Sequence, residues 1–92
     1  TPSTPTTPST NEIVATAENS FTPGSLTVSK GSTVTFTFGS VTHNVTFAAA
    51  TGAPADISNS SGTSVPRVFA TAGTFGYDCT IHYGMHGTVT VN

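Results

Sequence analysis

Apolar residues and threonines alternate along most of the chain beyond residue 11. In the stretch STVTFTF, residues 32–38, every second residue from Val34 onward is valine or phenylalanine, and the residues between them are threonines. A period of two places the apolar side chains on one face of a β-strand, and the β-branched threonine suits the face in contact with water. Similar patterns recur in residues 26–28, 43–47, 74–79 and 87–91. The chain therefore predicts a series of short strands, each with one buried face.

Glycine and proline interrupt this alternation at short intervals, as is typical of turns between strands. The turn signals lie at residues 23–24, 30–31, 39–40, 52–54, 58–62 and 73. Short strands separated by such turns predict an all-β domain, a Greek-key β-sandwich. Residues 46–58 (TFAAATGAPADIS) could hold one short turn of helix.

The first ten residues, TPSTPTTPST, are all threonine, proline or serine. Such a composition cannot bury a core, and we expect residues 1–11 to form an extended linker or tail before a single domain at residues 12–92. Tracts of this kind commonly tether domains outside the cytoplasm. We therefore expect the sequence to be part of a longer protein, in which this linker tethers the domain. We expect that protein to be periplasmic, exposed at the cell surface or secreted. With no apolar run of about eighteen residues, we expect no direct insertion into a membrane.

Charged residues are sparse: two basic and four acidic side chains give a formal net charge of -2. There is no basic stripe to bind phosphates, so the composition excludes nucleic acid as a partner. Weak charge also gives weak long-range steering, and a partner should be recognised mainly by local shape and apolar contact. We expect the domain to be a monomer.

The nine residues CTIHYGMHG, 79–87, contain the only cysteine, the only methionine and two of the three histidines of the chain. A single cysteine cannot form an internal disulfide. Cys79, His82 and Met85 are each separated by two residues, and a tight loop of this length can turn all three side chains toward one centre.

His43 can complete this set from a different strand. It lies 36 residues before Cys79, on the apolar face of residues 43–47, and Cys79 lies on the apolar face of residues 74–79. If both faces are buried, the imidazole and the thiol can meet at one end of the sandwich. A thiolate and two imidazoles in a plane, with a weakly bound thioether above it, form the blue-copper arrangement.

These motifs resemble those of the cupredoxins over nearly all of residues 12–92. FTPGSLTVSKGSTVTFTF (21–38) is similar to the early strands of the family, and VTHNVTF (41–47) is similar to the strand with the first histidine ligand. AGTFGYDCTIHYGMHGTVTV (72–91) is similar to the closing strand, ligand loop and last strand. The loop is most similar to that of amicyanin. Plastocyanin and pseudoazurin are more distant, because their longer spacing would place Gly87 at the axial position.

The resemblance implies a type 1 copper site with one ion that cycles between Cu(I) and Cu(II). The expected ligands are His43, Cys79 and His82 in the equatorial plane and Met85 in the axial position. The family also implies that Asn44 hydrogen-bonds the backbone beside the cysteine, with Thr80 as its partner. Such bonds orient metal ligands and tune the metal.

Some residues depart from the family pattern or carry a separate motif. Ile81 stands where many relatives have proline, Phe36 stands where tryptophan is common, and His86 has no assigned role in the family. Asn44 and Asn59 each begin a match to the N-glycosylation acceptor pattern. We discount the match at Asn44, because a glycan there would lie against the metal loop.

The expected function is electron transfer without substrate chemistry. Electrons would pass through the exposed edge of His82 to a redox protein, such as a cytochrome c or a copper or quinone oxidoreductase. This partner would dock on an apolar collar that includes Tyr83 and Gly84. The sequence shows neither a nucleophile with a base and an orienting acid nor paired catalytic carboxylates, so we expect no enzyme.

Three other functions are compatible with the sequence. A copper delivery or storage protein would use the same ligands. Such proteins usually have additional exposed methionines or histidines, and here only His86 is available for that purpose. A metal-free adhesion or spacer module would leave the histidines and the cysteine without a function. The domain could also form one part of a larger oxidase or reductase, in which another domain is catalytic.

Overall fold

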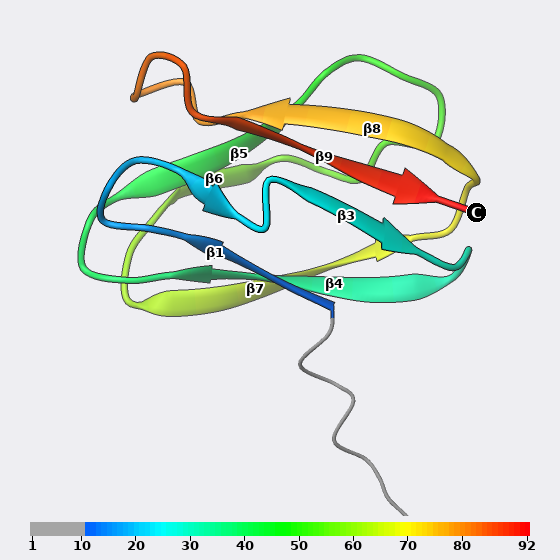
Figure 1. Cartoon of the computed structure of the whole chain (residues 1–92), viewed down its shortest axis with the longest axis horizontal. Helices are drawn as coiled ribbons and strands as arrows, with labels where there is room; N and C mark the ends of the chain where they lie inside the picture. Colours follow the sequence, from blue (N-terminus) through cyan, green and yellow to red (C-terminus); the bar gives the residue numbers. More distant parts are fainter. Residues whose placement is uncertain (1–10) are drawn as a thin grey trace, which may run out of the picture.

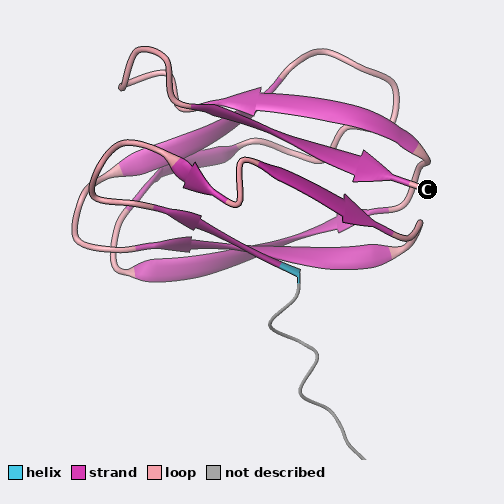
Figure 2. Cartoon of the chain, in the orientation of Figure 1, coloured by secondary structure: helices cyan, strands magenta, loops and turns pink. Residues whose placement is uncertain are grey.

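The computed structural model describes residues 11–92, which form two β-sheets packed face to face (Figure 1). Strands and the loops between them make up residues 12–92 (Figure 2), and the all-β prediction is confirmed. The strands are β1 (Glu12–Ala15), β2 (Phe21–Thr22), β3 (Ser25–Val28), β4 (Ser32–Phe38), β5 (His43–Phe47), β6 (Ile57–Ser60), β7 (Thr63–Phe69), β8 (Gly73–Asp78) and β9 (His86–Val91). The predicted linker, residues 1–11, lies outside the described residues except for Asn11. Within residues 11–92, no helix is long and apolar enough to cross a membrane.

The two sheets are both mixed. One contains four strands in the order β2-β1-β4-β7, and the other contains five in the order β3-β9-β8-β5-β6. The parallel pairs are β1 with β4 and β3 with β9, and the other neighbours are antiparallel. The chain crosses repeatedly from one sheet to the other, so strands that are distant in sequence become neighbours in space.

Strand ends from both sheets meet at one end of the sandwich. Ala15, the last residue of β1, pairs with Phe38, the last residue of β4. β5 begins at His43, β8 ends at Asp78 and β9 begins at His86. In Figure 1 the loop between β8 and β9 lies at the left end, where β5 begins. Loops from both sheets therefore surround the residues that the sequence identified as metal ligands.

The core contains the residues that the alternation predicted. Val34, Phe36 and Phe38 on β4 are at most 2% exposed, and the threonines between them are less buried. Tyr77 lies among aromatic rings, with its centroid 4.8 Å from that of Phe21 and 5.5 Å from that of Phe36, both edge to face. Such contacts stabilise the core beyond the burial of area alone.

The segment that we expected to hold a turn of helix, residues 46–58, contains the end of β5, a loop and the start of β6. Residues 48–56 connect β5 to β6 and contain a turn in which the Ala53 amide donates to the Ala50 carbonyl oxygen at 3.1 Å. Gly52 has a φ of 88°, a left-handed conformation that cannot continue a right-handed helix. The expectation of a helical turn is therefore wrong.

The Tyr77 hydroxyl is the one buried side-chain polar atom of residues 11–92 that lacks a hydrogen-bond partner. The Tyr77 ring packs against Gly87, its register partner on β9, where a Cβ atom would overlap the ring and its oxygen. Close packing therefore requires glycine at this position. Burial disfavours the charged phenolate and raises the pKa of Tyr77 above its usual value.

The variant Tyr77→Phe removes the unpaired hydroxyl and keeps the ring. We expect the free energy of unfolding near neutral pH to stay the same or to rise by about 1 kcal/mol, because an unsatisfied buried polar group is costly. Above about pH 10 the unfolded phenol ionises while the folded phenol stays protonated, so the unfolded state binds fewer protons and the wild type loses stability.

Denaturant titrations of both proteins between about pH 8 and about pH 11 measure this effect. The difference in unfolding free energy between Tyr77→Phe and the wild type should be constant below about pH 10 and should then widen by about 1.4 kcal/mol for each further pH unit. Tyr83→Phe serves as the control, because Tyr83 is fully exposed. A constant difference over the whole range would contradict a buried, un-ionised phenol at Tyr77.

Candidate metal centre

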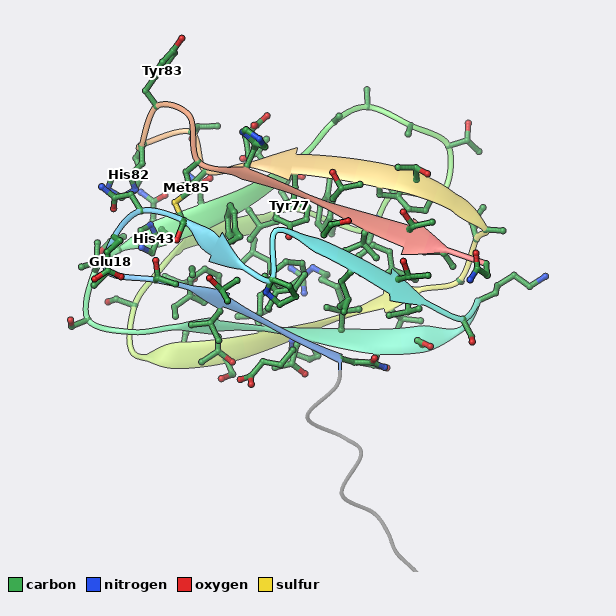
Figure 3. All side chains as sticks on the ribbon, viewed as in Figure 1. Glu18, His43, Tyr77, His82, Tyr83 and Met85 are labelled. Carbon is green, nitrogen blue, oxygen red and sulfur yellow. The ribbon has the colours of Figure 1, made fainter. Side chains whose placement is uncertain are left out.

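Four side chains that can bind metals meet where β5 begins. His43, the first residue of β5, is 0% exposed, and Cys79, directly after β8, is 3% exposed. Met85 is 2% exposed and His82 is half-buried. Figure 3 shows His43, His82 and Met85 at the same end of the sandwich. The fold thus brings together side chains that come from two distant segments of the sequence.

The spacing of Cys79, His82 and Met85 corresponds to two successive turns. The His82 amide donates to the Cys79 carbonyl oxygen at 3.3 Å, and the Met85 amide donates to the His82 carbonyl oxygen at 3.1 Å. The Cys79 amide donates in turn to the Met85 carbonyl oxygen at 2.9 Å. Gly84, in the second turn, has a φ of 83°, which glycine adopts without strain. Backbone hydrogen bonds therefore fix the points from which all three side chains start.

Three donor atoms converge within this loop and the start of β5. The Nδ1 atoms of His43 and His82 lie 3.0 Å apart. The Cys79 sulfur lies 3.4 Å from Nδ1 of His82 and 3.9 Å from Nδ1 of His43. The potential ligand atoms of the three residues all lie within 4.8 Å of one another. One ion can contact all three residues.

The tautomer of His43 follows from a backbone contact. Its Nε2 atom lies 2.8 Å from the carbonyl oxygen of Thr16, in the loop after β1. A carbonyl oxygen can only accept, so Nε2 carries the proton in this contact. In the tautomer with a proton on Nε2 alone, Nδ1 has a lone pair that faces His82 and Cys79. The Thr16 amide donates to the Ser20 carbonyl oxygen at 2.8 Å, which holds the loop in place. The fold thus selects the form of His43 that can bind a metal through Nδ1.

Asn44 links the start of β5 to the ligand loop. Its backbone amide donates to the Cys79 sulfur at 3.5 Å. Its side-chain Nδ2 donates to Oγ1 of Thr80 at 2.8 Å, and its Oδ1 accepts from the Thr80 amide at 3.0 Å. The structure therefore places Asn44 and Thr80, the pair expected from the resemblance, in direct contact beside the cysteine.

The donor set suits copper. Thiolate and thioether sulfur are soft ligands that select copper, and imidazole binds copper well. A methionine thioether is not among the usual ligands of a structural zinc site. His43, Cys79, His82 and Met85 form a type 1 copper-like site.

The surface beside His82 is partly apolar. Ile81 is 46% exposed, and Tyr83 is 109% exposed relative to a free reference residue. Figure 3 shows Tyr83 projecting from the tip of the ligand loop. Glu18, on the loop after β1, lies at the same end and is also exposed. The partly exposed imidazole thus has an aromatic and an aliphatic neighbour along the chain and one carboxylate on the facing loop.

His86 lies outside the metal centre, and two residues that the sequence did not indicate contact it. His86 begins β9, is exposed and pairs in register with Asp78, outside the group of converging donors. Thr16 and Asn59 contact the site, the first through its carbonyl oxygen and the second through a bond from Nδ2 of Asn44 at 3.0 Å. Nothing in the sequence indicates Thr16, because every residue has a carbonyl group, and Asn59 was notable only as a glycosylation match.

A family model of copper-binding proteins, the plastocyanin/azurin family, matches residues 10–92. A search of curated protein sequences found no significant match.

Several solved structures are similar to this chain. A mutant plastocyanin of a fern has a TM-score of 0.77 and 32% identity, over 88% of this chain and 99% of that one. The oxidised plastocyanin from Dryopteris crassirhizoma has a TM-score of 0.75 and 30% identity, again over 88% of this chain and 99% of that one. A reduced Cu(I) form of an amicyanin mutant has a TM-score of 0.76 and 28% identity, over 88% of this chain and 80% of that one. A copper-containing nitrite reductase from Thermus scotoductus matches 88% of this chain but only 22% of its own, with a TM-score of 0.77, and at 24% identity it shows the fold alone.

The contact with Thr16 predicts one tautomer of His43 in the copper-free protein. Nitrogen-15 NMR of the neutral imidazole should show the proton on Nε2, and this proton should exchange slowly with water because it is buried and hydrogen-bonded. The exposed His86 provides the internal control and should show fast exchange. A neutral His43 with its proton on Nδ1 would contradict the assignment.

Proposed function

The chain belongs to the plastocyanin/azurin family of copper-binding proteins, and we propose that it carries single electrons by means of one copper ion bound at the end of the sandwich. The residues that would hold the ion are His43, Cys79, His82 and Met85. The observation that supports this most is the convergence of the two histidines and the cysteine within 4.8 Å. When bound, copper supplies a Cu(I)/Cu(II) couple that gains and loses one electron.

The protein's own contribution is to hold the ligands in place. His43 is oriented by the Thr16 carbonyl oxygen, and the Cys79 sulfur accepts a hydrogen bond from the Asn44 amide. Thr80 ties the ligand loop to Asn44. Because these bonds fix the positions of the ligating side chains, the side chains need to move little when the charge of a bound copper ion changes.

We assign the entry and exit of the electron to the exposed edge of His82. This ring is less buried than His43 or Cys79, so a partner can approach it closely. The docking surface consists of Tyr83 and Gly84 with the neighbouring Ile81. The fitting partner is a redox protein, such as a cytochrome c or a copper or quinone oxidoreductase, that meets a monomer in a small, transient interface.

The domain on its own should be an electron carrier and not an enzyme. The proposed ligand set leaves no coordination position for a substrate. Copper delivery or storage is less well supported, because the spare His86 lies outside the group of donors. A metal-free adhesion module would not need the inward-facing imidazole and thiol. If the domain forms part of an oxidase or reductase, we assign it the role of passing electrons to a separate catalytic domain.

The proposed location is outside the cytoplasm, in the periplasm, at the cell surface or in secreted form. The threonine- and proline-rich residues 1–11 support this proposal, because such a tract can act as an extended tether for the domain at residues 12–92.

Addition of Cu(II) to the copper-free protein tests the proposed site. We expect one equivalent of copper to bind and to give an intense blue or green charge-transfer band that depends on the thiolate. Cys79→Ser should abolish the band. A colourless product with the electron paramagnetic resonance signal of square-planar copper would contradict the proposal.

The pair of variants Met85→Ala and His86→Ala tests the axial assignment. Met85→Ala should keep the colour and shift the reduction potential, because the axial ligand tunes it. His86→Ala should match the wild type in both respects. The opposite result would reassign the axial ligand to His86.

Tyr83→Ser tests the docking surface. We expect the second-order rate of electron transfer to a c-type cytochrome to fall about tenfold, because an exposed aromatic anchor can contribute more than 1 kcal/mol to an interface. The charge-transfer band should not change. Val68→Ser is the matched control, since Val68 is also exposed, at 56%, but pairs with Thr33 on β4, away from the ligand loop. Equal rates for Tyr83→Ser and the control would contradict docking at Tyr83.

A further inference from the structure

The pairing of β5 with β6 is irregular next to the metal centre. Its register shifts between His43 and Val45, so that Ser58 and Asn59 of β6 lie opposite Asn44 alone. An irregularity of this kind re-aims a side chain. Here Oδ1 of Asn59 accepts a hydrogen bond from Nδ2 of Asn44 at 3.0 Å.

The hydrogen-bonding capacity of the Asn44 side chain is fully used. Asn44 is 7% exposed. Its Oδ1 accepts from the Thr80 amide at 3.0 Å and from Oγ1 of Thr46 at 3.3 Å, and its Nδ2 donates to Oγ1 of Thr80 at 2.8 Å. The Thr80 amide can only donate, so it fixes the orientation of the Asn44 carboxamide. The second Nδ2 proton then has Asn59 as its acceptor.

A displacement of Asn44 would reach the metal ligands by two routes. Its backbone amide donates to the Cys79 sulfur, and its side chain holds Thr80, which directly follows Cys79 in the loop. Without Asn59 one proton of a nearly buried carboxamide would lose its acceptor. Because an unsatisfied buried donor is costly, Asn44 would turn toward water or another acceptor and strain its bonds to Thr80.

We propose that Asn59 is a positioning residue of the metal centre, which acts through Asn44 to hold the ligand loop against β5. The functional consequence rests on the proposed copper site, whereas the chain of bonds from Asn59 through Asn44 to Thr80 includes none of the proposed ligands. Asn59 is exposed on β6, an edge strand of its sheet, so its replacement leaves the core intact.

Three variants separate positioning from a general effect on β6. Asn59→Ala removes the acceptor, whereas Asn59→Asp keeps an acceptor oxygen in the same place. Ser58→Ala is the matched control on the same strand. In the copper-free protein, hydrogen exchange of the Thr80 amide should become about two- to tenfold faster in Asn59→Ala. Asn59→Asp and Ser58→Ala should keep the wild-type rate.

The same variants loaded with copper provide the second readout. Release of Cu(I) to a chelator should become about tenfold faster in Asn59→Ala, with a changed charge-transfer band, and should return toward the wild-type rate in Asn59→Asp. Wild-type behaviour of Asn59→Ala in both measurements would overturn the inference, as would equal effects in Ser58→Ala. If the wild type bound no copper, the proposed function would fail, whereas exchange at Thr80 would still decide whether Asn59 positions the loop.

Discussion

The hydrogen bond from Nε2 of His43 to the Thr16 carbonyl oxygen is the contact on which the metal centre depends. Thr16 follows β1 of the four-stranded sheet, and His43 begins β5 of the five-stranded sheet, so the bond joins the two layers. It places the proton on Nε2 and leaves Nδ1 free to bind a metal. Because the packed side chains between the sheets set their separation, the core of the sandwich also sets the position of the first imidazole.

The rest of the site combines a fixed interior with an exposed edge. Cys79 is buried and accepts a backbone hydrogen bond, and two successive turns return the chain from Cys79 to Met85. Tyr83 lies at the tip of the same loop and is fully exposed. The same seven residues, 79–85, therefore supply the soft ligands and the surface that a partner can contact. A carrier of single electrons needs both properties, since its ligands should keep their arrangement while partners come and go.

Much of this arrangement could be predicted from the sequence, because it rests on patterns of side chains. The alternation predicted the buried faces that turn His43 and Cys79 inward, and the two-residue gaps predicted a tight loop. The contacts of Thr16 and Asn59 could not be predicted, since one uses a carbonyl group that every residue has and the other depends on a register shift set by the packing of two strands. The turn of helix expected within residues 46–58 does not form, because Gly52 has a left-handed conformation that cannot continue a right-handed helix.

X-ray absorption at the copper edge of the loaded protein identifies the atoms that bind the ion, and so it tests the proposed ligand set. We expect two imidazole nitrogens and one thiolate sulfur to be the nearest neighbours of copper, and we expect the sulfur to be lost in Cys79→Ser. Nearest neighbours consisting only of nitrogen and oxygen in the wild-type protein would contradict the assignment of His43, Cys79 and His82 as the ligands of a type 1 copper ion.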